Sequence, residues 1–133
     1  MSTNVERLVA AREGLPKLQT YVISMRSTDA FRSGDTEEDA AVILAHLEYL
    51  FDLEARGILL GSGPVGEYTR ERLNAMCFVA APDLDAAVRI AEEEPFHRAG
   101  WRINEVQKWR INEGVILDVV REAVDRFGSG SAA

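Results

Sequence analysis

Several residue types are scarce in this 133-residue chain, which has one cysteine, two histidines, and 15 Lys and Arg against 22 Asp and Glu. A single cysteine excludes an intrachain disulfide. The formal net charge of −7 argues against binding to nucleic acid or to an anionic membrane, because both need basic patches. With 47% hydrophobic residues, the chain can still build the core of one ordinary domain.

Long apolar runs are also missing. The opening residues MSTNVERLVA contain no apolar stretch of signal-peptide length, and no later stretch approaches the length of a membrane span. We therefore expect a cytoplasmic protein. Its cysteine, Cys77, lies in the apolar run MCFVAA, where a small buried thiol is the ordinary role, whereas a reactive thiol needs an electropositive, partly open setting.

Periodicity and turn residues predict one α+β domain over residues 15–127, preceded by an arm or short helix over residues 1–14. The helix over residues 36–56 has the clearest start, since Thr36 and Asp39 match a capping signature. The glycine- and serine-rich end over residues 128–133 reads as a flexible tail. The other predicted elements are strands over residues 18–26, 72–81 and 101–111, a short strand that opens into a Gly/Pro loop within residues 57–68, and helices over residues 83–94 and 115–127.

The order of these elements is β-α-β-β-α-β followed by an extra helix, which is the ferredoxin-like split βαβ pattern. Such a unit has a four-stranded antiparallel sheet with two helices on one face. The last strand carries Trp101, Ile103 and Trp109 on one side, so the second face of the sheet needs a cover. A homodimer with facing sheets is one solution, and the C-terminal helix folding back is the other.

Three segments in this order resemble the YCII-related (YciI-like) family of the dimeric α/β-barrel superfamily: AHLEYLFDLEARGILLGSGPVGE, AAPDLDAAVRIAEEEPFHRAGW and VQKWRI. The resemblance covers roughly residues 18–111. It implies a ferredoxin-like fold, dimerisation through the sheets, and a cleft near the first long helix. The understood relatives are similar to proton-transfer enzymes, including a dehydrochlorinase that acts on a chlorinated hydroxyquinol-type ring.

The resemblance also implies site residues. The family carries a histidine on the first long helix and an aspartate before a Pro-Phe or Pro-Tyr pair, which match His46 and Glu94 here, and a Gly-Pro that matches Gly63 and Pro64. This chain departs from the family pattern in having Glu94 where aspartate is usual. The added methylene displaces the carboxylate by enough to disturb proton-transfer geometry.

The residues themselves leave the role of His46 open. Successive residues of a helix are rotated by about 100°, which places Val42, Leu50 and Leu53 within about 40° of His46. The imidazole therefore lies in the apolar stripe, either as a core histidine with satisfied nitrogens or as an acid–base group in a cleft.

Glu94 raises a similar question, because carboxylates near the C-terminus of a helix are disfavoured by the macrodipole. Pro95 favours extended backbone at Glu94, so its side chain can leave the helix surface and reach His46. The alternative is that Glu92, Glu93 and Glu94 are all solvated.

Other candidate site residues are less specific. Ser62 could line the cleft, and Arg26, Arg70 and Arg72 could hold an anionic substrate by bidentate contacts, although arginines at strand ends are often only solvated. The two histidines, His46 and His97, have no third ligand at metal-binding spacing, so we expect no metal.

The sequence therefore predicts a cofactor-independent enzyme for a small aromatic or anionic molecule. His46 and Glu94 would transfer protons in an isomerase or lyase reaction, and Ser62, Gly63, Pro64 and Arg26 would bind the substrate. The alternative is a non-catalytic metabolite-binding or dimeric scaffold module, since the fold hosts both kinds of function.

Overall fold

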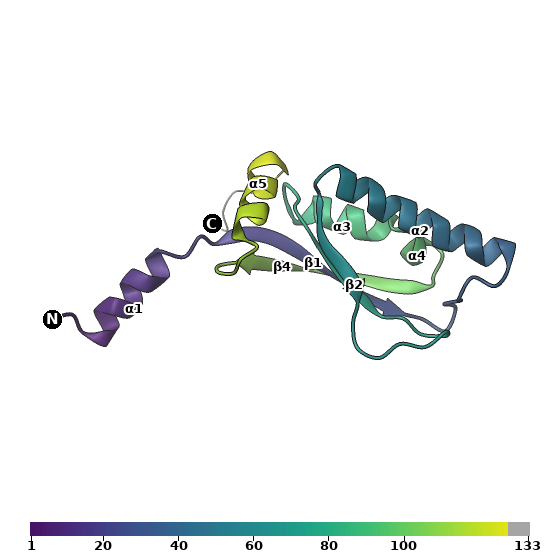
Figure 1. Ribbon diagram of the computed structural model, residues 1–133, viewed down its shortest axis with the longest axis horizontal. Coiled ribbons are helices and arrows are strands. Elements are labelled where there is room, and N and C mark those ends of the chain that lie inside the picture. Colours follow the sequence, from purple (N-terminus) through teal and green to yellow (C-terminus); the bar gives the residue numbers. More distant parts are fainter. Residues whose placement is uncertain (128–133) are drawn as a thin grey trace.

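A computed structural model describes residues 1–127 of the chain (Figure 1). The predicted tail over residues 128–133 lies outside the described residues. The elements are α1 (Asn4–Glu13), β1 (Leu18–Ser27), α2 (Glu37–Ala55), β2 (Leu59–Pro64), β3 (Ala75–Val79), α3 (Leu84–Glu93), α4 (Pro95–Arg98), β4 (Arg102–Ile111) and α5 (Leu117–Phe127).

The four strands form one antiparallel sheet in the order β2-β3-β1-β4. Helices α2 and α3 lie together on one side of this sheet (Figure 1). Strand β1 is central, and its Ile23 faces Cys77 of β3 and Val106 of β4. The predicted ferredoxin-like α+β arrangement is confirmed.

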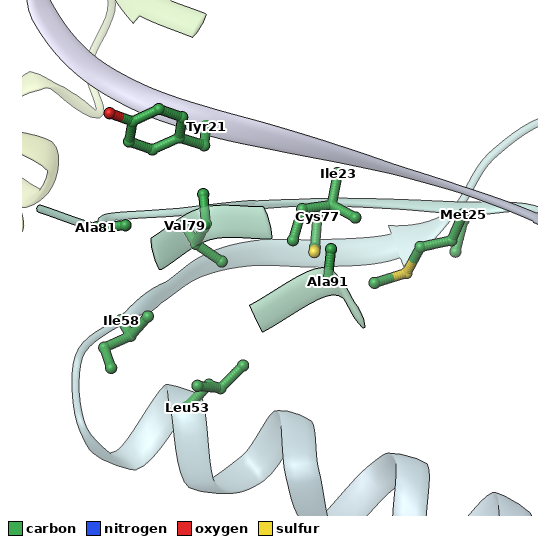
Figure 2. Packing of buried hydrophobic residues seen from close by; sticks show 11 residues of the cluster. Tyr21, Ile23, Met25, Leu53, Ile58, Cys77, Val79, Ala81 and Ala91 are labelled. Atoms are coloured by element: carbon green, nitrogen blue, oxygen red, sulfur yellow. The ribbon is translucent and has the colours of Figure 1, made fainter. Parts of the chain in front are cut away.

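The main core fills the space between the sheet and these helices. Alternate residues of β1, namely Tyr21, Ile23 and Met25, are buried there, as the two-residue period of a strand requires. Figure 2 shows them with Leu53 of α2 and Ala91 of α3. Cys77 belongs to the same cluster, and burial raises the pKa of its thiol to about 12, which fits a packing role rather than a nucleophilic one.

Helix α2 begins and ends as its sequence predicts. The hydroxyl of Thr36 accepts a hydrogen bond from the backbone N–H of Asp39 at 3.1 Å, and three acidic residues in the first turn match the positive end of the helix dipole. After Ala55, Gly57 adopts a φ of +73°, a conformation that glycine reaches without strain.

The second face of the sheet is covered at one end by α5. Residues Leu18 and Ile111 face each other across β1 and β4, on the side opposite to Tyr21 and Ile23, and they pack against Val120 and Val124 of α5. The remainder of this face stays open, with Met76, Ile103 and Trp109 between 40% and 42% exposed. The chain itself thus provides part of the predicted cover, and dimerisation over the rest stays a prediction.

Two details of the sequence analysis were wrong. No helix is predicted between residues 94 and 101, yet residues 95–98 form the short helix α4 and include His97. Trp101 does not share the environment of Trp109. It precedes β4 and packs with Phe31 and Phe96 in a separate buried cluster, whereas Trp109 lies on the open sheet face against the ring of Phe78.

The N-terminal segment forms the helix α1, which projects away from the body of the domain (Figure 1). Thr3 and Glu6 form a capping box at its start, and all of its residues are exposed. None of the helices within residues 1–127 is long and apolar enough to cross a membrane.

Candidate active site

Glu94 is the residue at which α3 ends and α4 begins. Its backbone is extended, with φ −64° and ψ 128°, as expected for a residue before proline. Its side chain is 1% exposed, whereas Glu92 and Glu93 are exposed. One carboxylate oxygen, Oε2, accepts a hydrogen bond from the backbone N–H of His97 at 3.1 Å. Glu94 thus caps the N-terminus of α4, where a negative charge is favourable.

His46 of α2 meets Glu94 inside the domain. Its Nδ1 lies against Oε1 of Glu94 in a direct hydrogen bond between two buried side chains. The imidazole also stacks on the ring of Phe96, with the centroids 3.8 Å apart and the planes within 5°. Because these contacts hold the ring from its edge and from one face, the orientation of His46 is fixed.

Asn104 of β4 supports the pair from the sheet. Its side-chain amide donates to the backbone carbonyl of Ala91 at 2.9 Å and to Oε2 of Glu94 at 3.3 Å. Its backbone N–H donates to Nδ1 of His97 at 3.1 Å, so His97 has a structural role as an acceptor. The carboxylate of Glu94 is therefore held from α2, α4 and β4.

The electrostatics favour an ionised Glu94. Burial by itself raises the pKa of this carboxyl group, but the hydrogen bond and charge of His46 and the N–H groups of His97 and Phe96 lower it more, and the pKa lies below its usual value. An ionised carboxylate can only accept, so Nδ1 of His46 carries the proton of this hydrogen bond. The other nitrogen, Nε2, makes no hydrogen bond to any residue within 1–127, and it is the atom free to exchange a proton.

A cavity of about 300 Å³ adjoins His46, a volume at the lower end of the range for small-molecule sites. Its walls are apolar with a few polar groups. They comprise Phe31, Arg32, Ser33, Ile43, His46, Leu47, Thr69, Arg70, Leu73, Phe96 and Arg102. An imidazole backed by a carboxylate thus forms part of the wall of a ligand-sized space.

Arg102 is a site residue that the sequence analysis missed. It opens β4 and is 3% exposed. Its Nε donates to the backbone carbonyl of Leu73 at 3.1 Å, and its Nη1 lies 3.8 Å from the sulfur of Met25. Burial lowers the pKa of Arg102, against the opposing effect of the Glu94 charge, but an arginine remains protonated in proteins. The only signal in the sequence was that Arg102 is an even-numbered residue of β4. It therefore lies on the same side of the strand as Val106, which packs against the core under the helices.

The predicted substrate-binding residues are divided between two regions. Ser62, Gly63 and Pro64 lie on the edge strand β2 and line a different hollow, with Met76 and Trp109, on the open sheet face. Arg26 is exposed and lies 3.6 Å from Glu105. None of these four residues lines the cavity beside His46, and their binding of substrate stays a prediction. Of the other two predicted anion-binding residues, Arg70 lines this cavity and Arg72 does not.

A larger cavity of about 360 Å³ lies between α2 and α3. The acid–base candidate in its wall is the half-buried Tyr49, whose hydroxyl donates to the backbone carbonyl of Ile90 at 2.8 Å, and burial raises its pKa to about 12. A phenol with so high a pKa is poorly suited to proton transfer near neutral pH. Among residues 1–127, no three His, Cys, Asp or Glu side chains gather as a metal site would require. The cavity beside His46 is therefore the better candidate, although it is the smaller one.

Comparisons with known proteins place the chain in a family. Two solved structures are similar in part: 5-chloro-2-hydroxyhydroquinone dehydrochlorinase (TftG) from Burkholderia phenoliruptrix AC1100, in complex with 2,5-dihydroxybenzoquinone, and the hypothetical protein ORF119 from Sulfolobus islandicus rod-shaped virus 1. The first is 24% identical, with 66% of this chain and 92% of that chain covered and a TM-score of 0.46. The second is 14% identical, with 92% and 93% covered and a TM-score of 0.35.

With TM-scores below 0.5, neither similarity bears on the function of this chain. No curated protein matches. A sequence profile of the YCII-related domain matches residues 20–110, which span the sheet, helices α2 to α4, and both His46 and Glu94. The chain belongs to the YCII-related domain family.

Proposed function

We propose that this protein is a small-molecule enzyme that transfers protons without a cofactor, as an isomerase or a lyase. The observation that carries the proposal is the buried His46–Glu94 pair at the wall of a cavity of about 300 Å³. A histidine held by a carboxylate through Nδ1 presents Nε2 as a general base, and the carboxylate stabilises the imidazolium that forms.

The chemical step is the removal of a proton from an activated carbon. Nε2 of His46 takes the proton, and the electron pair of the C–H bond moves into an adjacent conjugated system of the substrate. An isomerase returns the proton to another carbon, and a lyase expels a leaving group from the neighbouring carbon instead. In both cases the positive charge on His46 lies beside the negative charge of Glu94, which lowers the energy of the intermediate.

The apolar walls support this reaction class. Phe31, Leu73 and Phe96 line the cavity, and an environment with little water strengthens the interaction between the imidazolium and the carboxylate. The same walls accept a flat conjugated molecule. A C–H group next to a conjugated system is acidic enough for a histidine to deprotonate.

Deuterium exchange tests the proposal without knowledge of the net reaction. The protein is incubated in D₂O with a panel of hydroxylated quinols, hydroxybenzoates and conjugated keto acids, and the loss of C–H signals is followed by NMR. We expect the protein to exchange a C–H of at least one compound. Glu94→Gln and His46→Gln should each slow this exchange by about 10²- to 10⁴-fold, the usual contribution of general acid–base catalysis.

The control is Glu93→Gln, which neutralises the exposed neighbour of Glu94 and should leave the exchange rate unchanged. A protein that binds members of the panel but exchanges none of their protons would be a metabolite-binding module. Equal rates in Glu94→Gln and Glu93→Gln would also overturn the proposal.

A further inference from the structure

The charged residues that line the cavity beside His46 are all basic. The lining contains the three guanidinium groups of Arg32, Arg70 and Arg102 and no carboxylate, in a chain whose net charge is −7. Since acidic residues outnumber basic ones by 22 to 15, this local excess of positive charge runs against the composition of the protein.

Two of these guanidinium groups lie at the rim. Arg70 is exposed and donates to both carboxylate oxygens of Asp35, at 2.6 and 2.7 Å. Arg32 is exposed as well and donates to the backbone carbonyls of Asp29 and Phe31, both at 2.9 Å. The chain itself thus neutralises the charge of Arg70, and water solvates that of Arg32.

Arg102 differs from both because it is buried and forms no ion pair with any residue within 1–127. Its partners are the carbonyl of Leu73 and the thioether of Met25, both uncharged. Its Nη2 donates to none of the described residues, and it is not among the fully enclosed atoms that lack a partner. The charge of Glu94 acts on Arg102 without contacting it. A buried cation with no counter-ion in contact is still costly, and an anion that enters the cavity and binds it offsets part of this cost.

Arg102 and His46 share one neighbour, the ring of Phe96. The Cζ atom of Arg102 lies 4.7 Å from the centroid of this ring, and the imidazole of His46 stacks on it at 3.8 Å. An anionic group bound to Arg102 therefore belongs to a molecule whose body lies in the same cavity as the proton-transfer atom.

We infer that Arg102 is an anion-binding residue and that the ligand of this cavity is a flat, largely apolar molecule with one carboxylate or phenolate group. The inference rests on the proposed function in naming the substrate class of the same site. A guanidinium group binds such an anion through two parallel hydrogen bonds, while Phe31, Ile43 and Leu73 contact the apolar body. A bare inorganic anion fits less well, because it makes no apolar contacts with these walls.

Three small probes test the inference by binding alone. Benzoate carries the anion on a flat ring, benzamide has the same shape without the charge, and inorganic phosphate has the charge without the ring. Each is titrated into the full chain, with amide and arginine Nε–H signals followed by NMR. We expect benzoate to bind at least tenfold more tightly than benzamide and phosphate, with shifts at Phe31, Leu73 and the Nε–H of Arg102.

Variants assign the preference to Arg102. Arg102→Met keeps the length and apolar contacts of the side chain, a type of replacement that buried ionic sites often tolerate, and it should lower the affinity for benzoate about tenfold while leaving benzamide unchanged. Arg102→Lys keeps the charge but not the paired donors, and it should retain part of the preference. The matched control is Arg56→Met, since Arg56 lines the larger cavity and pairs with Asp52 at the surface.

The binding results and the exchange results can fail separately. A preference for benzoate that depends on Arg102, without proton exchange on any compound, would support the inference and leave the proposed function wrong. Equal binding of benzoate and benzamide, or an Arg102→Met protein that keeps its native amide spectrum and the full preference, would overturn the inference. Exchange on neutral compounds that Arg102→Lys and Arg102→Met do not affect would overturn it while the proposed function stands.

Discussion

The two faces of the sheet differ in what they bury. The face that carries Tyr21, Ile23 and Met25 is covered by α2 and α3. The ionisable side chains of His46, Glu94 and Arg102 are buried on this face, near the start of β4. The opposite face buries apolar groups under α5 together with the uncharged Thr20, and it leaves Met76, Ile103 and Trp109 partly exposed.

The two faces therefore suggest different functions, namely catalysis on the first and association with another protein on the second. Ionisable groups are rarely buried unless they are paired or functional, so the first face identifies a site. Large apolar groups that remain exposed on one face of a sheet are characteristic of a surface that another protein covers. One sheet thus combines a candidate active site on one side with a candidate interface on the other, and each side can be disturbed without the other.

The largest expected effect is on the first face. Glu94→Ala leaves His46 without its carboxylate and removes the cap of α4, and breaking a buried pair by removing one partner costs about 3–5 kcal/mol. We expect a loss of this size in the free energy of unfolding, measured by urea denaturation followed by circular dichroism.

Glu93→Ala is the matched control for that measurement. Glu93 is exposed and one residue away, and changes at such positions usually stay within about 0.5 kcal/mol. Similar losses in the two variants would show that the burial of Glu94 contributes nothing specific to stability.

A smaller effect is expected on the second face. We expect the protein to be a homodimer through the open part of this face, and Trp109→Glu should place a charge on it and weaken self-association at least tenfold. Sedimentation equilibrium measures the association constant, and the free energy of unfolding of the monomer should change little, because Trp109 is already 42% exposed.

Leu44→Glu is the comparison for Trp109→Glu. Leu44 lies on α2 and is 56% exposed, so it introduces the same charge on the helix side of the domain. A wild-type protein that is monomeric at high concentration, or equal weakening by both variants, would refute the proposed interface.

The smallest effect is a dependence of stability on pH. The pKa of Glu94 is lower in the folded chain than its usual value, so ionised Glu94 contributes stability above the unfolded-state pKa of about 4.3. This contribution decreases as the pH falls from there through the folded-state pKa.

The measurement is the difference in free energy of unfolding between the wild type and Glu94→Gln, from pH 7 to pH 3. His46 and Arg102 are the ionisable side chains that act on Glu94, and both are present in the two proteins. We expect a constant difference near neutral pH that shrinks below about pH 4.3. A difference that grows on acidification would mean that the carboxyl is protonated in the native state.

Much of the fold could be read from the sequence because local patterns repeat at fixed periods. The cap at Thr36, the alternation along the strands and the stripe that contains His46 each depend on residues within one element, and the structure confirms them. The restriction that Pro95 places on Glu94 is equally local, and the extended backbone there is also confirmed.

The residues alone did not decide what Glu94 contacts. They left it either solvated or directed toward His46, and the family resemblance favoured the pair. The sequence analysis also missed α4, because a four-residue helix has no period to detect. The N-terminus of α4 explains why a carboxylate is favourable at Glu94, where the end of α3 alone would disfavour it.

By itself, then, the sequence determined the order of the strands and of the longer helices, the side of each of them that is apolar, and the position of the two candidate acid–base residues. Only the tertiary structure decided that Arg102 is buried without a carboxylate, that Ser62 to Pro64 lie apart from His46, and that α5 covers part of the second face. The physical reason is that a period fixes the direction of a side chain within its own element. The group that the side chain meets depends on elements far away in the chain, 48 residues in the case of His46 and Glu94.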